Sequence, residues 1–181
     1  KYIKEFIYLK KINMTNEILQ TAMKFHKKND LVNAEKKYRE FLRTEPKNSQ
    51  CLFILGTLLI QIERYKDAII ELNKSISENS KNYHAFQNLG IAYFEVKKFD
   101  SAIDSYRKSI ALNDKNAYAY NNLGLTLHKI REFNEAIKNF SLAIKLSPNK
   151  VYVFNRAKSF MGNKEYKSAI ENLTSFEESS S

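Results

Sequence analysis

The sequence is poor in cysteine and in the residues that interrupt regular structure. Its 181 residues include only 4 Gly, 2 Pro and 1 Cys. So few turn-forming residues argue against β-sandwiches and barrels, which must end many short strands. The glycines, at positions 56, 90, 124 and 162, are too far apart to form a GxGxxG or GxxxxGK phosphate loop. A single cysteine excludes an intramolecular disulfide framework and any CxxC motif.

Long apolar runs and clusters of metal ligands are missing from the sequence as well. No run approaches the roughly 18 apolar residues that span a membrane. His26, His84 and His128 lie far apart, and none has Cys, Asp or Glu at ligand spacing. No serine has the flanking glycines of a nucleophile elbow. We therefore expect a cytoplasmic protein without enzyme activity, metal or cofactor, in which Cys51 is a small packing residue or an inert thiol.

The few glycines and prolines that are present follow a fixed period. Gly56, Gly90 and Gly124 are 34 residues apart, and Pro46 and Pro148 are separated by three times that distance. Alanines keep the same step at Ala34, Ala68, Ala102 and Ala136, with Ala169 one residue early. A leucine or an aromatic residue precedes each alanine by three positions, at Leu31, Tyr65, Phe99, Phe133 and Tyr166. Such a period indicates a repeat architecture.

Within one period the apolar residues have helical spacing. In 83–116 a first stripe consists of Phe86, Leu89, Gly90 and Tyr93, and a second runs from Phe99 to Ile110. Each unit is therefore predicted to form two helices of roughly 14 residues joined by a short turn. The small residues let the two helix backbones approach each other. In the last unit we expect Gly162 and Asn163 to shape this turn.

These residues resemble the tetratricopeptide repeat (TPR) family, whose 34-residue helix-turn-helix unit has this spacing. The clearest copy, 117–149, fills the family's signature slots with Tyr120, Leu123, Gly124, Leu127, Ala136, Phe140, Ala143 and Pro148. The resemblance implies an all-α fold, a right-handed α-solenoid of stacked helix-turn-helix repeats. The expected repeats are 15–48, 49–82, 83–116, 117–149 and 150–181, the last of them degenerate and uncapped.

The two ends of the sequence differ from the repeats. We interpret residues 1–14 as an N-terminal helix or the remnant of a preceding repeat. A cationic amphipathic membrane or targeting helix is the weaker alternative, because the apolar stretch is short and contains a glutamate. After the expected last helix, about 165–177, no capping helix follows. We expect either truncation from a longer protein or an end that is used in self-association.

The first helices of TPR-like proteins line the concave face of the solenoid, and this face carries the candidate binding site. Two residues before each Gly or Ala slot stand Gln20, Ile54, Asn88, Asn122 and Asn155. An asparagine amide both donates and accepts hydrogen bonds, so consecutive asparagines can hold the backbone of an extended peptide. This asparagine ladder is similar to that of O-GlcNAc transferase-type TPR arrays. The alternative is a solvated or helix-supporting role for the asparagines.

Neighbouring positions on the same face would select side chains of the bound segment. The candidate residues are His84, Gln87, Phe94, Tyr118, Asn121, His128, Lys129, Lys158 and Phe53, next to Ile91, Glu95 and Leu125. Aromatic anchors among amides suit an extended peptide with some apolar side chains. The Lys and Asn clamp with which chaperone-binding TPR proteins hold a terminal carboxylate is not matched. Chaperone tails are therefore disfavoured as partners.

The net charge of +10 comes from 30 Lys and Arg against 20 Asp and Glu. The lysines are spread over all units, which favours a solvated surface and makes nucleic acid an unlikely partner. We predict a non-catalytic protein–protein interaction module or scaffold that binds a neutral to mildly acidic peptide or protein. The alternatives are the substrate-recognition segment of a larger enzyme, such as a glycosyltransferase, and a self-assembling scaffold that forms homo-oligomers through uncapped ends.

Overall fold

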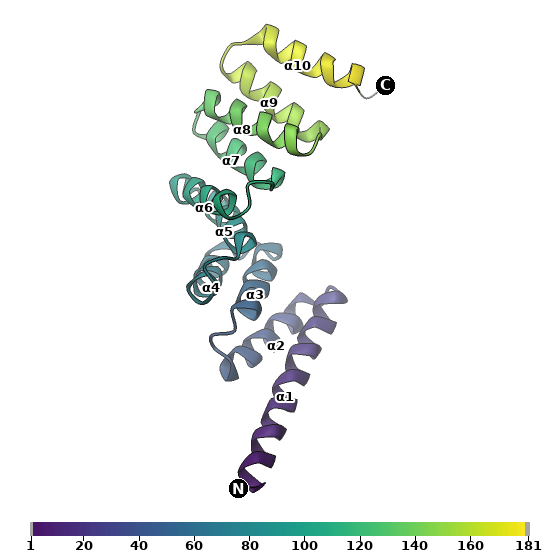
Figure 1. Cartoon of the computed structure of the whole chain (residues 1–181), viewed down its shortest axis with the longest axis vertical. Helices are drawn as coiled ribbons and strands as arrows, with labels where there is room; N and C mark the ends of the chain where they lie inside the picture. The colour runs from purple at the N-terminus through teal and green to yellow at the C-terminus, as the bar shows by residue number, and fades with distance from the viewer. Residues whose placement is uncertain (1, 180–181) are drawn as a thin grey trace. The chain divides into compact units, whose positions relative to one another are not determined.

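A computed structural model describes residues 2–179 of the chain, and the side chains of residues 14–175. The described residues form ten α-helices and no strand, which confirms the predicted all-α class (Figure 1). The helices are α1 (Tyr2–Lys27), α2 (Leu31–Thr44), α3 (Ser49–Gln61), α4 (Tyr65–Glu78), α5 (Tyr83–Glu95), α6 (Phe99–Leu112), α7 (Ala117–Lys129), α8 (Phe133–Leu146), α9 (Lys150–Gly162) and α10 (Tyr166–Ser179). None of these helices has the combination of length and hydropathy needed to cross a membrane.

The first helices of the pairs begin after asparagine N-caps. The side-chain oxygens of Asn48, Asn82, Asn116 and Asn149 each accept a hydrogen bond from a backbone N–H in the first turn of α3, α5, α7 and α9. Such a cap satisfies a donor that the helix itself leaves unpaired. The four asparagines follow the repeat, with the last one residue early. The polar clusters that end each predicted unit therefore also start the next helix.

The N-terminal segment is continuous with the first helix pair. Helix α1 runs from Tyr2 to Lys27 and contains Met14 without a break. Residues 2–13 are thus part of the helix that packs against α2. Their side chains lie outside the described residues, so the interpretation of 1–14 as the remnant of a repeat stays a prediction.

Each turn within a helix pair contains one residue in the left-handed backbone region. These residues are Asn29, Glu63, Lys97, Arg131 and Lys164, with φ between 59° and 68°. The expectation for Gly162 was wrong, since no glycine of the chain has a positive φ and Lys164 takes the left-handed position. Gly162 is instead required by packing, because a Cβ there would lie 2.6 Å from Cε1 of Phe133.

The chain divides into two compact units, Lys1–Ser80 with α1–α4 and Lys81–Ser181 with α5–α10. In unit 1 each helix packs against the next in the sequence. The core of unit 1 includes Ala22, Ala34, Tyr38, Phe41, Leu52, Leu55, Leu59, Ala68 and Leu72. Cys51 is buried in this core, and burial, with a smaller contribution from Glu71, raises the pKa of its thiol to about 12. The thiol is therefore protonated and inert at neutral pH.

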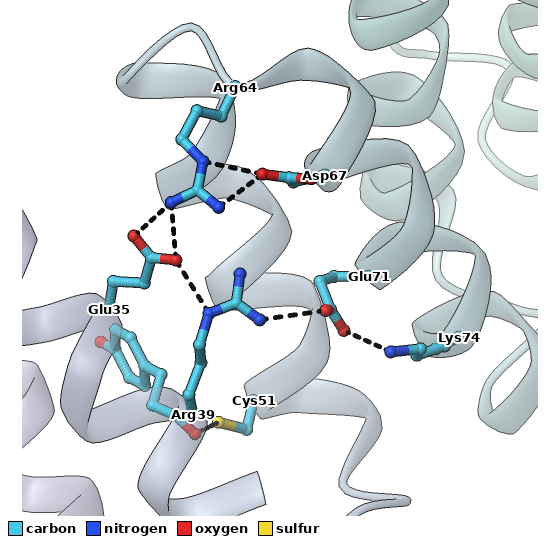
Figure 2. A network of polar contacts seen from close by, with 8 residues as sticks. Glu35, Arg39, Cys51, Arg64, Asp67, Glu71 and Lys74 are labelled. Carbon is cyan, nitrogen blue, oxygen red and sulfur yellow. Dashed lines mark hydrogen bonds and ion pairs between the residues drawn. The ribbon is translucent and has the colours of Figure 1, made fainter.

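An alternating ion-pair network joins α2 to α4 within unit 1. Its members, in order, are Asp67, Arg64, Glu35, Arg39, Glu71 and Lys74 (Figure 2). Glu71 is the buried member, and its carboxylate lies 3.4 Å from Nη1 of Arg39 and 3.2 Å from Nζ of Lys74. Two cationic partners offset the cost of removing this carboxylate from water.

In unit 2 the helices also pack in sequence order, and in addition α5 contacts α7 and α7 contacts α9. Glycines make the close approach within a pair possible. A Cβ at Gly90 would lie 2.5 Å from Cε1 of Tyr106, and one at Gly124 would lie 2.8 Å from Cε1 of Phe140. The second helices cover one side of the first helices, so α5, α7 and α9 form a row whose other side is available to a ligand.

Candidate functional site

The row of first helices in unit 2 carries nearly all the predicted site residues. We call their exposed side the α5/α7/α9 face. It is made up of His84, Gln87, Asn88, Ile91, Phe94, Glu95, Tyr118, Asn121, Asn122, Leu125, His128, Lys129, Phe154, Asn155, Lys158 and Met161. Phe53 is the exception among the predicted residues, because it lies on α3 in unit 1.

A pocket of about 170 Å³ opens on this face. Its lining residues are Ile91, Phe94 and Glu95 from α5, Tyr106 from α6, and Tyr118, Asn122 and Leu125 from α7. We call it the α5/α7 pocket. Sites for drug-sized molecules and cofactors usually enclose about 300–1,000 Å³, so this pocket is suited to a single side chain.

The only lining residue from a second helix is Tyr106. Its ring is buried against Gly90, with 2% of the residue exposed. The Tyr106 hydroxyl has no hydrogen-bond partner among the described residues. Every fully buried polar side-chain atom in this part of the chain does have a partner, so the hydroxyl oxygen is not fully buried. The hydroxyl is therefore the accessible part of this side chain, and it reaches the pocket. Burial first, and then Tyr118 and Glu95, raise the pKa of Tyr106, so the hydroxyl stays neutral.

Glu95 supplies a carboxylate to the same pocket. Its side chain is exposed, and none of the cationic side chains in the described part of the chain lies within 4 Å of it. Tyr118 is half exposed, and Phe94 is held by an edge-to-face contact with Phe99 at a centroid distance of 5.7 Å. The pocket thus combines aromatic and aliphatic walls with hydrogen-bond acceptors.

Two asparagines of the predicted ladder, Asn122 and Asn155, make hydrogen bonds with Asn121, which lies beside the ladder. Nδ2 of Asn155 donates to Oδ1 of Asn121 at 3.0 Å, and Nδ2 of Asn121 lies 3.4 Å from Oδ1 of Asn122. Asn121 and Asn122 are buried, and Asn155 is half-buried. The contact of Asn155 with Asn121 connects α9 with α7, which gives Asn155 a helix-supporting role, whereas the contact of Asn121 with Asn122 lies within α7. Asn88, which is half-buried on α5, lies in line with Asn122 at the repeat spacing.

The other predicted residues have partners of several kinds. Nδ2 of Asn116 donates to Oε1 of Gln87 at 2.6 Å, and the exposed His84 stacks on Tyr83 with a centroid distance of 3.9 Å. Nζ of Lys158 lies 4.7 Å from the ring centroid of Phe154, a cation–π distance. Lys158 and Phe154 thus form one exposed group on α9.

His128 lies between α7 and α9. Its Nδ1 is 2.9 Å from Oγ of Ser159. Burial first, and then the charges of Lys158 and Lys129, lower the pKa of His128. The imidazole is therefore mainly neutral at pH 7, within a part of the face whose two charged side chains are lysines.

Two features of the site were not found from the sequence. The periodic pattern placed Tyr106 in the apolar stripe of the second helix, without indicating that its hydroxyl reaches the face formed by the first helices. A signal in the sequence could have found it: the equivalent positions one repeat before and after hold Leu72 and Phe140, so Tyr106 is the one of the three that carries a hydroxyl group. The pairing of Asn155 with Asn121 was also missed, because repeat alignment matches Asn155 with Asn122.

No group of three or more His, Cys, Asp or Glu side chains within the described residues could hold a metal ion. Three family models match the sequence. One described as TPR repeat matches residues 92–130, and two described as tetratricopeptide repeat match residues 27–83 and 117–150. No curated protein sequence matches the chain.

Solved structures with the same fold cover most of the chain. A crystal structure of the MamA protein is 27% identical, with a TM-score of 0.87, and the match covers 91% of this chain and 90% of MamA. YrrB, described as a TPR protein with an unusual peptide-binding site, is 19% identical, with a TM-score of 0.77 and coverage of 88% and 82%. A tetratricopeptide repeat protein from Parabacteroides merdae is 21% identical, with a TM-score of 0.81 and coverage of 90% and 65%. The matches at about 20% identity concern the fold alone. Together with the ten helices, these findings support one conclusion: the protein is an all-α solenoid of the tetratricopeptide repeat type.

Proposed function

We propose that the chain is a non-catalytic protein-interaction scaffold and that its α5/α7/α9 face binds an extended peptide segment of a partner protein. The observation that carries this proposal is the α5/α7 pocket, which has the size of one side chain and lies on a row of packed helices. A peptide that runs across the row would place one side chain in the pocket and others along α7 and α9.

Exposed apolar side chains on the α5/α7/α9 face support the proposal. Tyr118, Leu125, Phe154 and Met161 are all exposed, although large apolar side chains are usually buried. Apolar and aromatic residues that are grouped on one face and interspersed with amides are typical of interaction sites. The net charge of +10 adds a general attraction for a mildly acidic partner.

The comparisons support the same class of function. The fold is shared with YrrB, for which a peptide-binding site is described, and with MamA. Matches to TPR-repeat folds are typically interaction modules, which agrees with a scaffold that has no catalytic residues of its own.

A selection experiment tests the proposal. We would incubate the full chain with a phage-displayed library of random 12-residue peptides and repeat the selection with the double variant Tyr118→Ala, Leu125→Ala. Because both side chains are exposed, the variant should fold normally and lose at least about tenfold in affinity for the selected peptides. The matched control is Leu112→Ala, Leu142→Ala, which removes two apolar side chains that are each 43% exposed on the second helices. Equal loss in both double variants, or no captured peptide, would contradict the proposal.

The asparagine ladder is tested with the same peptides. If Asn88, Asn122 and Asn155 hold the peptide backbone, the triple change to alanine abolishes capture of every selected sequence. Undiminished capture would show that the asparagines serve only to connect the helices. Circular dichroism and urea unfolding of the triple variant separate a loss of binding from a loss of fold.

A self-assembling scaffold is the second candidate, and exposed side chains on α10 favour it. Tyr166, Ile170 and Leu173 are exposed there, with Ile170 at 64%. If these residues join two copies of the chain, sedimentation velocity will show a mass that rises with protein concentration. The substitution Ile170→Lys will then keep the chain monomeric, because burying an unpaired ammonium group is costly. A monomer at all concentrations would exclude this candidate.

A further inference from the structure

We propose that the α5/α7 pocket takes a lysine or arginine side chain of the bound peptide, and that the adjoining position between α7 and α9 takes an acidic side chain. The α5/α7/α9 face would then select a segment in which a basic and an acidic residue lie about three positions apart. This inference rests on the proposed function, and it specifies which class of peptide the face would bind.

The polar groups of the pocket accept hydrogen bonds from a cation. Among the described residues the Glu95 carboxylate has no cationic partner within 4 Å, and the Tyr106 hydroxyl has no hydrogen-bond partner. Tyr118 and Asn122 add a phenol and an amide oxygen to the same lining. A lysine ammonium group carries three donors and an arginine guanidinium five, whereas an acidic side chain would meet the negative charge of Glu95.

The apolar walls suit the stem of such a side chain. Ile91 and Leu125 are aliphatic, and the rings of Phe94 and Tyr118 line the pocket together with them. Long basic side chains bury their methylene groups along apolar surfaces and keep the charged end in a polar environment. A cation near an aromatic face gains a further electrostatic attraction from the ring.

The next position along the face has the opposite charge. Shifting the pocket residues by one repeat replaces Phe94, Glu95 and Leu125 by His128, Lys129 and Lys158, and replaces the hydroxyl-bearing Tyr106 by Phe140. Neither Lys129 nor Lys158 has a carboxylate within 4 Å in the part of the chain that the structure describes. This position therefore attracts an acidic side chain and repels a basic one.

The distance between the two positions sets the spacing of the peptide's charges. Packed helices have axes about 8–10 Å apart. An extended chain advances about 3.3–3.6 Å per residue. About three residues therefore separate the basic side chain over α5 and α7 from the acidic side chain over α7 and α9. One basic and one acidic residue together leave the segment neutral, as the sequence predicts for the partner.

The peptide selection described above tests this inference when its sequences are read by position. We expect Lys or Arg to be enriched at one position, and Asp or Glu about three residues away. The variant Glu95→Gln keeps the shape of the side chain and removes its charge, so selection on it should lose the Lys or Arg enrichment and keep the acidic one. The matched control is Glu132→Gln, another exposed and unpaired glutamate of unit 2, which lines a different pocket.

A double-mutant cycle measures the contact itself. The selected peptide and its norleucine analogue, which keeps the methylene stem and lacks the charge, are titrated against the full chain and its Glu95→Gln variant by fluorescence anisotropy. We expect norleucine to weaken binding about two- to fivefold to the natural chain, as for a partly exposed ion pair, and to have no effect on the variant. Comparing lysine with arginine in the same peptide shows which of the two basic residues the pocket prefers.

Four results would overturn the inference, three of them without affecting the proposed function. If selected peptides depend on Tyr118 and Leu125 but show no basic residue at a fixed position, the face binds peptides and the charge selection is wrong. The same holds if Glu95→Gln keeps the full Lys or Arg enrichment, or if norleucine binds as well as lysine. A chain that captures no peptide would overturn the proposed function and this inference with it.

Discussion

The turn residues in the left-handed region show how single positions shape the repeats. Asn29, Glu63, Lys97, Arg131 and Lys164 occupy equivalent places between the two helices of each pair. For a residue with a side chain the left-handed conformation costs roughly 1–2 kcal/mol, while glycine adopts it readily. Asparagine tolerates this conformation, so the strain that glycine would relax lies in the four turns other than that of Asn29. Sequence periodicity could not show these turns, because no glycine marks the position.

Replacing one of these residues tests the strain directly. We expect Lys97→Gly to raise the free energy of unfolding by about 0.5–1 kcal/mol, since the relief of strain exceeds the added flexibility of glycine in the unfolded chain. Urea unfolding monitored by circular dichroism measures the change. Lys97→Ala is the control, because it removes the same side chain and keeps the left-handed strain. Equal stabilisation by alanine would assign the effect to the lysine side chain instead.

The half-buried His128 predicts how stability depends on pH. The pKa of His128 is lowered in the folded chain from its ordinary value of 6.5, so the unfolded chain binds this proton more readily. The contribution of His128 to stability is therefore complete above pH 6.5 and is lost as the pH falls below it. We expect the wild-type chain to lose more unfolding free energy than His128→Gln between about pH 7 and pH 5.5. Identical pH profiles in urea unfolding would contradict this.

At the scale of helices, buried serines link the two helices of a pair. Oγ of Ser75 donates to the carbonyl oxygen of Ser49 at 2.8 Å, and Oγ of Ser109 donates to that of Tyr83 at 2.9 Å. Both serines are fully buried. The sequence predicted a small residue at this slot of the repeat. The hydrogen bond could not be predicted, because Ala143 fills the same slot in the next pair.

Removing one of these hydroxyl groups should weaken the pairing of α5 and α6. We expect Ser109→Ala to lower the free energy of unfolding by about 1 kcal/mol, because it removes the donor of the hydrogen bond to the Tyr83 carbonyl oxygen at the start of α5. Ser105→Ala is the matched control on α6. Its hydroxyl bonds to the carbonyl oxygen of Ser101 within the same helix, at 2.7 Å, so its loss should change stability by less than about 0.5 kcal/mol. Equal losses of unfolding free energy in the two variants would mean that the hydrogen bond between α5 and α6 stabilises the chain no more than one within a helix.

The fold was predictable because its signal recurs in every repeat. The small residues, exemplified by Gly90 and Gly124, face large side chains of the second helix, and this pattern places both helices of a pair. The contacts of the candidate site each occur once, so no repeated signal in the sequence indicates them. Whether the Tyr106 hydroxyl reaches a pocket, and whether Asn155 contacts Asn121 or Asn122, depends on shifts of a few ångströms that the periodic pattern does not contain. Gly162 was misassigned because a glycine near a turn commonly shapes it, whereas here the Phe133 ring requires the glycine.

At the scale of the whole molecule, the two units were not predicted, since the repeat spacing continues unchanged across residues 80 and 81. We expect a core substitution in one unit to leave the other intact. Leu55→Ala removes a fully buried side chain of α3 and should destabilise unit 1 by about 2–5 kcal/mol.

Hydrogen exchange measured on the full chain checks this expectation. Amide protons of α1–α4 should exchange faster in Leu55→Ala, while those of α5–α10 and the affinity for a selected peptide stay unchanged. The mirror variant is Leu123→Ala, which removes a buried side chain of α7 and should accelerate exchange in unit 2 only. Faster exchange over all ten helices in either variant would show that the chain unfolds as one cooperative body.

The division into two compact units has a mechanical consequence. A chain pulled from its ends should lengthen in two separate steps, because each unit has its own core to break. The unit of residues 1–80 would release at most about 27 nm of chain and that of residues 81–181 about 34 nm, at roughly 3.4 Å per extended residue. If the α5/α7/α9 face binds a partner as proposed, unfolding of residues 1–80 alone would lengthen the chain while the unit that holds the partner stays folded.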